Sequence, residues 1–166
     1  MGIERWAETP QWYVLHTHLK QEERANKNLR LWGIETLHAK VRTRRFNEFT
    51  GTPINITEPL FPRYLFARFN GREQLTKIRF TRGVHHVVCF GKSPAPVDQE
   101  IIDIIRAHID ERGFVKENVE LNPADKVVVS AGPLRNLLAI FEREVKGSER
   151  SMILLSAIVY QGPSCG

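Results

Sequence analysis

Basic and amide side chains gather where the first predicted helix begins, and a threonine and an arginine precede a glycine further along the chain. These residues are His18, Lys20, Gln21, Arg24, Thr81 and Arg82. Such side chains at a helix start can hold phosphates and touch base edges, and a neighbouring histidine can stack on an unpaired base. A solvated helix face explains the same residues equally well. The pattern alone leaves nucleic-acid binding and a plain polar surface open.

Metal and catalytic chemistry have weaker support. His16 and His18 share one face of a predicted strand, but no cysteine, aspartate or third histidine stands at ligand spacing nearby. A phosphate-binding loop ending in Gly91-Lys92-Ser93 would need glycine where the chain has His86. No serine or cysteine lies in a nucleophile elbow, and no carboxylate pair stands out. We therefore expect neither an enzyme nor a bound metal or cofactor.

The stretch from Glu58 to Phe66 reads EPLFPRYLF and joins two prolines to an aromatic strand. The prolines exclude a helix, and the predicted strand continues to Phe69. Period-two alternation divides this strand into two faces. One face holds Arg63, Leu65, Ala67 and Phe69, and the other holds Tyr64, Phe66 and Arg68. Since neither face is purely polar, we expect a central strand with one face covered and the other meeting a partner. Burial of every aromatic in the core is the alternative.

Composition suits one domain with a small appendage. The chain has 166 residues, 42% of them hydrophobic, which is enough for a domain of about 100 residues and a short module. The first 97 residues carry 16 Lys/Arg against 8 Asp/Glu, and an excess of this kind steers a protein toward polyanions or acidic protein surfaces. Two cysteines and no signal peptide or membrane span favour a cytoplasmic protein, expected to be a monomer.

The remaining patterns predict an α+β sandwich in which two helices cover one face of a four-stranded antiparallel sheet. Strands are expected at 11–17, 35–46 and 84–90, beside the aromatic strand. Helices are expected at about 20–32, 70–80 and 98–113, the first with Ala25, Leu29 and Trp32 on one face and Gly33 after its end. A turn at 50–53 makes the second strand one arm of a hairpin rich in arginine, at Arg42, Arg44 and Arg45.

The last part of the chain supports two readings. Residues 113–123 carry charge and few large apolar side chains, which indicates a linker. Beyond them, leucine and other apolar residues recur at helical spacing, with Pro133 suited to a first turn and Gly147 to a stop. The members of this series are Leu134, Leu137, Leu138, Phe141 and Val145. Residues 127–129 and 152–159 equally suit strands.

Several motifs together resemble the NusG family. WYVL at 12–15, EPLFPRYLF at 58–66 and TRGV at 81–84 look like its N-terminal domain, and DKV at 125–127 with GPL at 132–134 resembles a degenerate KOW module. Within the family, EPLFP, TRGV, FGKSPA and RSMILL at 150–155 look most like the operon-specific RfaH branch. The resemblance implies a NusG N-terminal domain at 10–112, a linker at 113–123 and a KOW-like module at 124–166, as a β-barrel or an α-hairpin.

The function implied by the resemblance is transcription elongation and antitermination. Such a factor bridges the RNA polymerase clamp and the opposite side of the main channel, and it suppresses pausing and termination. The implied clamp contacts are Phe61, Tyr64, Phe66 and Phe90. The surface that captures exposed non-template DNA in such factors matches six residues of this chain: His18, Lys20, Gln21, Arg24, Thr81 and Arg82.

RfaH-like proteins hide the clamp-binding pocket under a helical C-terminal hairpin that refolds into a barrel on release. Here Glu58 and Arg150 occupy the positions of the pair that ties the two domains, and Leu137, Phe141 and Leu154 are the implied apolar contacts. An exposed ion pair contributes only about 0 to 1 kcal/mol, so we expect the apolar helical face to supply most of the stabilisation.

Departures from the family pattern keep other functions open. Gln74, Leu75 and Thr76 replace a His-Thr-Thr contact to the polymerase gate loop. Ala124 and Asn136 replace glycines of the KOW module, and the chain ends at Gly166, where the last barrel strand is expected. One alternative is a general NusG-like factor whose KOW part docks ribosomal protein S10. Another is a plain nucleic-acid-binding module.

Overall fold

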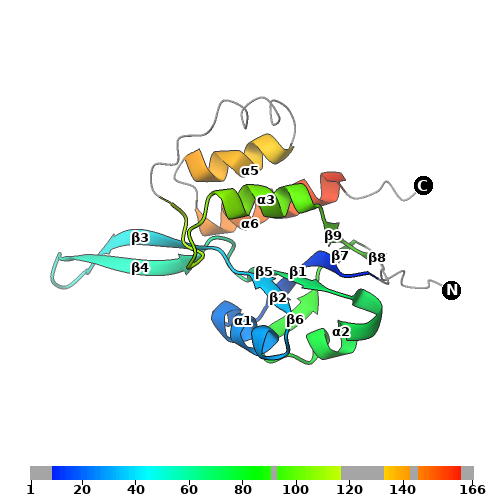
Figure 1. Cartoon of the computed structure of the whole chain (residues 1–166). Helices are drawn as coiled ribbons and strands as arrows, with labels where there is room; N and C mark the ends of the chain where they lie inside the picture. The colour runs from blue at the N-terminus through cyan, green and yellow to red at the C-terminus, as the bar shows by residue number, and fades with distance from the viewer. Residues whose placement is uncertain (1–8, 91–92, 117–132, 143–145, 162–166) are drawn as a thin grey trace.

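The computed structural model describes residues 9–90, 93–116, 133–142 and 146–161 (Figure 1). Its centre is an antiparallel sheet in the order β2-β5-β1-β6, with the short strand β9 paired to β1. The strands are β1 Gln11–Thr17, β2 Glu35–Leu37, β5 Tyr64–Phe69, β6 Val84–Val87 and β9 Pro96–Val97. The expected mixture of helices and antiparallel strands is confirmed, as are the bounds of the first strand.

Strand β5 lies inside the sheet, between β2 and β1, and both of its faces are buried. Leu65, Ala67 and Phe69 pack with helices α1 (Glu22–Leu31) and α2 (Gly71–Arg79). Phe66 packs on the opposite face in a second apolar cluster. The predicted central position and the predicted division of the strand into two faces are therefore both confirmed.

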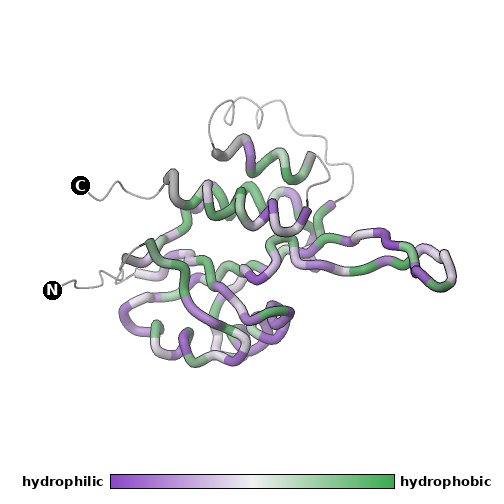
Figure 2. The backbone as a smooth tube through the Cα atoms, turned by 180° about the vertical axis from the view of Figure 1, so that it is seen from behind, coloured by the Kyte–Doolittle hydropathy of each residue, from purple (hydrophilic) through white to green (hydrophobic). Residues whose placement is uncertain are grey.

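Helices α3 (Gln99–Ala107), α5 (Pro133–Glu142) and α6 (Gly147–Gln161) lie on the face of the sheet opposite α1 and α2 (Figure 1). We call α5 and α6 together the C-terminal cover. Hydrophobic residues colour much of the helices on this face in the rear view (Figure 2). Among the described residues, no helix has the length and apolar character needed to cross a membrane.

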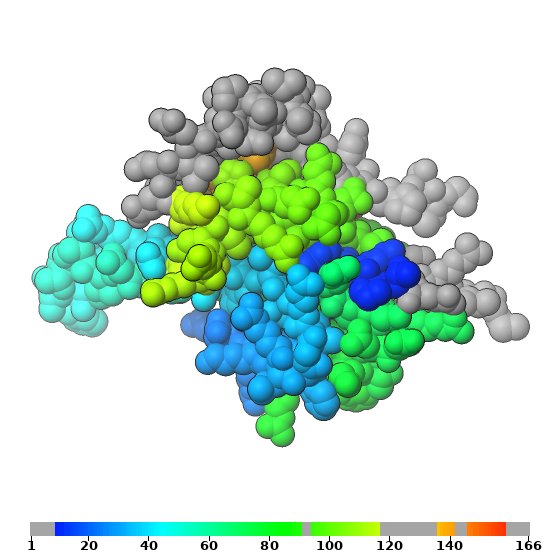
Figure 3. Space-filling model, in the orientation of Figure 1, coloured from blue at the N-terminus to red at the C-terminus, as the bar shows by residue number. Residues whose placement is uncertain are grey.

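The predicted single strand at 35–46 is wrong. The chain leaves the sheet after β2, and residues Lys40–Phe46 form β3, which pairs with β4 (Pro53–Pro59) in a separate hairpin. The change of direction is held where the Lys40 N–H donates to the Gly113 carbonyl at 2.8 Å and the Leu60 N–H donates to the Ala39 carbonyl at 2.8 Å. The hairpin stands clear of the body, as Figures 1 and 3 show.

The Glu58 to Phe66 run divides between two strands, because a turn separates β4 from β5. Arg63 in this turn has a φ of 69°, an uncommon conformation for a residue with a side chain. The Glu22 carboxylate accepts from the Arg63 N–H at 2.8 Å, and the Arg63 carbonyl accepts from the Thr17 N–H at 2.8 Å. These bonds from α1 and β1 fix the turn that carries Phe61.

Other predicted boundaries also shift. Trp32 is 55% exposed, off the apolar face of α1, and Lys77 Nζ lies 4.9 Å from its ring centre. The strand expected at 84–90 divides into β6 and β7 (Cys89–Phe90), which pairs with β8 (Ser93–Pro94). Helix α3 ends at Ala107 rather than at residue 113, because the Asp110 carboxylate accepts from two following backbone N–H groups and forms a turn.

The C-terminal residues that the structure describes are helical. Residues 152–159 lie in α6, so the strand reading of this segment is not the one observed. Gly147, the predicted helix stop, is instead the first residue of α6. The KOW positions at 124–132, residues 117–123 of the expected linker, and Val145 lie outside the described residues. In the described part of that linker, Phe114 and Val115 bridge to Lys40 and Ile109 of the N-terminal part.

Candidate functional site

Two of the three predicted clamp residues on the aromatic run lie deep beneath the C-terminal cover. Phe61 and Phe66 are 2% and 1% exposed, and their ring centres lie 6.0 Å apart in an edge-to-face arrangement. Tyr64 is half-buried at the margin of the same cluster. We call these three residues the aromatic face. Phe90, the fourth predicted contact, lies on β7, is 38% exposed and is not among the residues of this cluster.

The predicted apolar contacts of the cover meet this cluster directly. Leu137 of α5 and Leu154 of α6 are fully buried in it together with Phe61 and Phe66. Phe141 is half-buried and stacks on His108 at the end of α3, with ring centres 4.2 Å apart and planes inclined by 15°. Burial of large apolar side chains of this kind supplies about 1.5 to 3 kcal/mol each.

Arg150 anchors α6 to the turn below it. Its Nε donates to the Leu60 carbonyl at 2.6 Å and an Nη donates to the Pro59 carbonyl at 3.3 Å, while the residue is 6% exposed. Burial lowers the pKa of Arg150, and the negative charge of Glu58 opposes that shift. The hydrogen bonds of 2.6 and 3.3 Å join Arg150 to backbone carbonyls, and the residue is buried rather than exposed, so its expected pairing with Glu58 stays a prediction.

Neighbouring residues tighten the same contact. Ser151 Oγ donates to the Pro62 carbonyl at 3.1 Å. A Cβ on Gly147 would lie 2.8 Å from Pro62 Cγ, so glycine lets α6 begin directly against this proline. Glu58 forms an ion pair with Arg45 of the hairpin. The turn between β4 and β5 is thus where the cover meets the N-terminal part of the chain.

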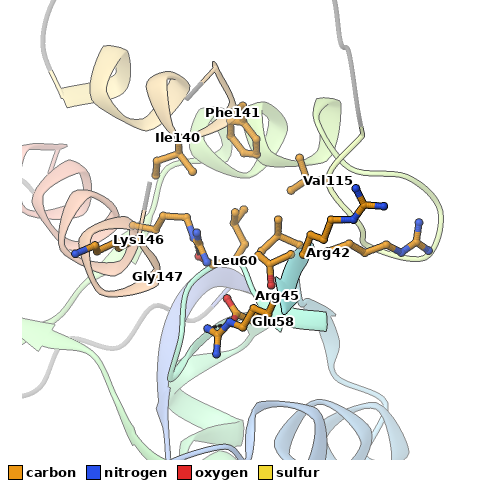
Figure 4. Close-up of a pocket in the computed structure, with 13 residues that line it drawn as sticks. Arg42, Arg45, Glu58, Leu60, Val115, Ile140, Phe141, Lys146 and Gly147 are labelled. Carbon is orange, nitrogen blue, oxygen red and sulfur yellow. Dashed lines mark hydrogen bonds and ion pairs between the residues drawn. The ribbon is translucent and has the colours of Figure 1, made fainter. Parts of the chain in front are cut away.

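A cavity of about 900 Å³ opens between the base of the hairpin and the cover (Figure 4). Its walls combine charged and apolar side chains from both parts of the chain. Its lining includes Arg42, Arg45, Glu58, Leu60, Phe141 and Arg150. The cover therefore closes the aromatic face tightly at the turn and less completely beside the hairpin.

The predicted nucleic-acid residues form a second surface on the other side of the sheet. The His18 N–H donates to the Gly83 carbonyl at 3.0 Å, and Asn28 Nδ2 donates to the Arg82 carbonyl at 3.1 Å. A Cβ on Gly83, whose φ is 98°, would lie 2.8 Å from the Ala25 nitrogen, so the glycine turn packs directly on α1. These contacts bring the start of α1 beside Arg82.

The members of this surface differ in accessibility. His18, Lys20, Arg24 and Arg82 are exposed and Gln21 is half-buried, and we call these five residues the helix-start surface. Thr81 is 4% exposed, and its hydroxyl donates to the Lys77 carbonyl at 2.8 Å. Thr81 thus supports the turn from within, and its contact with nucleic acid stays a prediction.

The substituted gate-loop positions lie in α2. Gln74 Oε1 accepts from the Asn70 N–H at 2.8 Å, and the Asn70 side chain accepts from the first N–H groups of the helix. Leu75 packs at the edge of the cluster beneath α1 and α2. Only Thr76 of the three is exposed. Gln74 therefore stabilises the start of α2, and Leu75 packs this helix against the core.

Sequence reasoning missed a group of histidines beside the helix-start surface. His16 has two histidine neighbours, His85 and His86, and nitrogen atoms of all three lie within 4.8 Å of one another. The expectation that no third histidine stands nearby is wrong, because β6 pairs with β1. The adjacent pair in TRGVHH was the available signal, but it becomes informative only once these two strands are known to be neighbours.

Comparison with protein-family models identifies the family. A family model described as "Transcription termination factor nusG" matches residues 10–106, more than half of the chain. A solved structure described as "Domain interaction in Thermotoga maritima NusG" is similar, with 20% sequence identity, a TM-score of 0.40 and coverage of 68% of each chain. A likeness at this level does not establish how the parts of the chain are arranged. On the family match, the chain belongs to the NusG family of transcription termination and elongation factors.

Proposed function

We propose that this protein is an RfaH-like elongation and antitermination factor whose polymerase-binding surface is the aromatic face. NusG-family factors interact with RNA polymerase. In the proposal, Phe61, Tyr64 and Phe66 receive the clamp helices, the helix-start surface captures exposed non-template DNA, and the C-terminal cover keeps the aromatic face closed until the factor is recruited.

One observation carries this proposal: helices α5 and α6 bury an aromatic face that belongs to the family-matched part of the chain. Phe61 and Phe66 together expose almost nothing while the cover is in place. Aromatic anchors in a desolvated pocket are where binding energy concentrates at interfaces. A partner that uses these side chains must therefore displace the cover first, which ties binding to the open state.

The cover then sets the apparent affinity for polymerase. When only a fraction of a protein is in the binding-competent state, the apparent dissociation constant rises by the inverse of that fraction. Leu137 and Leu154 stabilise the closed state through burial, and Arg150 does so through its two carbonyl contacts. Weakening any of these contacts should increase polymerase binding without adding any new contact to polymerase.

The helix-start surface supports the DNA part of the proposal. Its exposed basic residues and His18 lie together although they come from separate segments. Contacts of lysine and arginine with phosphates release counterions, so binding of single-stranded DNA should weaken steeply with salt, with a logarithmic slope of about −0.7 per phosphate. Arg24→Gln and Arg82→Gln should each reduce that slope.

Polymerase capture tests the clamp assignment. The full chain, a Leu154→Asp variant that opens the cover and a matched Met152→Asp control are compared for binding to the cognate polymerase. Met152 is 66% exposed on the same helix, so its substitution should leave the cover closed. Leu154→Asp should bind more tightly, and adding Tyr64→Ala should remove most of that gain.

Equal binding by all four proteins would refute the clamp assignment. A pause assay with the same polymerase over upstream regions of long operons then tests activity, and the opened variant should shorten pauses. Circular dichroism compares the full chain with a chain whose tail is freed by cleavage within residues 117–132. Unchanged helix content after cleavage would argue against an RfaH-like refolding tail.

A further inference from the structure

Four of the six histidines of the chain lie together at one end of β1 and β6. The ring centre of His16 lies 4.7 Å from that of His86 and 5.4 Å from that of His85. His85 and His86 are 4.8 Å apart, and His18 lies 5.0 Å from His85 by the same measure. We call His16, His85 and His86 the histidine cluster, with His18 at its margin.

A bulge explains how two adjacent residues of β6 reach the same neighbour. Successive side chains of a regular strand point to opposite faces, so His85 and His86 should diverge. Here His16 pairs with His86 and Thr17 pairs with Val84, which leaves His85 as the extra residue of β6. Bulges re-aim side chains and occur often beside functional sites. The bulge turns His85 toward the side of the sheet that His16 and His86 share.

Ring nitrogen atoms of all three histidines lie within 4.8 Å of one another. His16 Nδ1 is buried and has no hydrogen-bond partner among the residues that the structure describes. Nδ1 of His85 and Nδ1 of His86 share a hydrogen bond at 2.6 Å, and a metal ion bound between the two rings would replace it.

The ligand set selects a class of metal ion. Imidazole nitrogen suits Zn²⁺, Cu²⁺ and Ni²⁺, whereas Mg²⁺ and Ca²⁺ require oxygen ligands. Zinc binds histidine nitrogen at about 2.0 to 2.1 Å. The three nitrogen atoms, which now lie up to 4.8 Å apart, must therefore move closer together to bind one ion. His85 and His86 are exposed, and rotation of their side chains can bring this about without disturbing the core.

We propose that His16, His85 and His86 form a binding site for one divalent transition-metal ion, of which Zn²⁺ is the type, with His18 placed to become a fourth ligand. The bound ion would join β1 to β6 at the edge of the helix-start surface. It would also lie close to the aromatic face, because the His16 ring centre is 5.0 Å from that of Tyr64. The site stands on the histidine geometry and does not depend on the proposed function.

Calorimetric titration of the full, tag-free chain with zinc chloride tests the site. We expect one ion per chain and at least a tenfold weaker affinity for His85→Ala or His86→Ala, since the protein loses one of three ligands. The His85→Ala/His86→Ala double variant should lose stoichiometric binding altogether. Both residues are exposed, so the variants should fold, and circular dichroism checks this.

Glu73→Gln is the matched control, because it removes an exposed possible ligand elsewhere on the surface and should leave the affinity unchanged. The double variant also keeps His38 and His108, so binding by scattered histidines would survive in it. Absence of saturable binding, or binding that the double variant retains, would overturn the proposal. With one ion bound, weaker affinity in His18→Gln identifies a fourth ligand, and unchanged affinity supports a site of three histidines.

Discussion

On one face of β5, Leu65, Ala67 and Phe69 pack against α1 and α2, whereas on the other Phe66 packs against α3 and the C-terminal cover. The first face is closed mainly by side chains such as Ala25, Leu29 and Ile78, all fully buried, and α1 also makes a polar contact through the buried Glu22. The second face is closed partly by polar groups, because Arg150 and Ser151 dock on backbone carbonyls of the turn between β4 and β5.

This difference predicts how readily each pair of helices, α1 with α2 and α5 with α6, separates from the sheet. An apolar helix face has no favourable exposed state, so α1 and α2 should separate from the sheet only when the whole domain unfolds. A buried guanidinium costs desolvation energy that its hydrogen bonds must offset, and it regains hydration when it is released. The proposed function assigns release to the C-terminal cover and permanence to α1 and α2.

Truncating Phe69, a large buried side chain on the α1 and α2 side of β5, should have the largest effect. Phe69 is 1% exposed, and its ring centre lies 4.7 Å from that of Tyr13. Phe69→Ala should lower the free energy of unfolding by about 3 to 5 kcal/mol, because it removes buried contacts and leaves a cavity. Urea denaturation followed by circular dichroism measures this loss. Phe80→Ala, at a residue 83% exposed, should change it little.

Truncation of Leu154 in the C-terminal cover should have a local effect. Leu154→Ala should cost about 2 to 5 kcal/mol at its site, and that cost should appear as opening of α5 and α6 while the sheet stays folded. Hydrogen exchange should accelerate in residues 133–142 and 146–161 and stay unchanged in α1 and α2. Met152→Ala is the control on the same helix. Equal acceleration in α1 and α2 would show that the two faces unfold together.

Substitution of Arg150 measures how much its polar contacts, as distinct from apolar burial, stabilise the closed cover. Arg150→Met keeps much of the buried chain but leaves the Leu60 and Pro59 carbonyls without these donors, which should cost about 1 to 3 kcal/mol. Hydrogen exchange of α6 again provides the measurement. Lys146→Met removes an exposed positive charge four residues earlier and should have little effect. Unchanged exchange in Arg150→Met would mean that the two hydrogen bonds of Arg150 do not help to hold the cover.

Local patterns predicted the parts of this comparison that depend on neighbours in sequence. Alternation assigned Leu65 and Phe66 to opposite faces of β5, and the turn at Gly51, whose φ is 66°, places the hairpin correctly. Residues 35–46 look like one strand because nothing local marks the exit of the chain after β2. That exit depends on contacts with residues 113 and 114, more than 70 positions away.

Non-local contacts also explain what sequence reasoning missed in the candidate sites. The pairing of β1 with β6 and the bulge at His85 bring the histidine cluster together, and neither is visible in composition or spacing. The tail was ambiguous because its apolar residues suit both a helix and a strand. Burial of Leu137 and Leu154 against the aromatic face favours the helical form, and that contact partner lies in another part of the chain.

Acidification should destabilise the packing of α1 on the sheet, because the buried His38 lies beside this helix. Its side chain is 6% exposed, and its Nδ1 lies 3.6 Å from the Glu23 carboxylate. Burial lowers the pKa of His38 below its usual 6.5, although Glu23 acts in the opposite direction. The unfolded chain therefore binds this proton more readily, and the neutral form stabilises the fold fully above pH 6.5. The free energy of unfolding should fall as the pH drops below that value toward the folded-state pKa. Denaturation of His38→Gln over the same range should show a smaller fall, and an identical pH profile would assign the dependence to other groups.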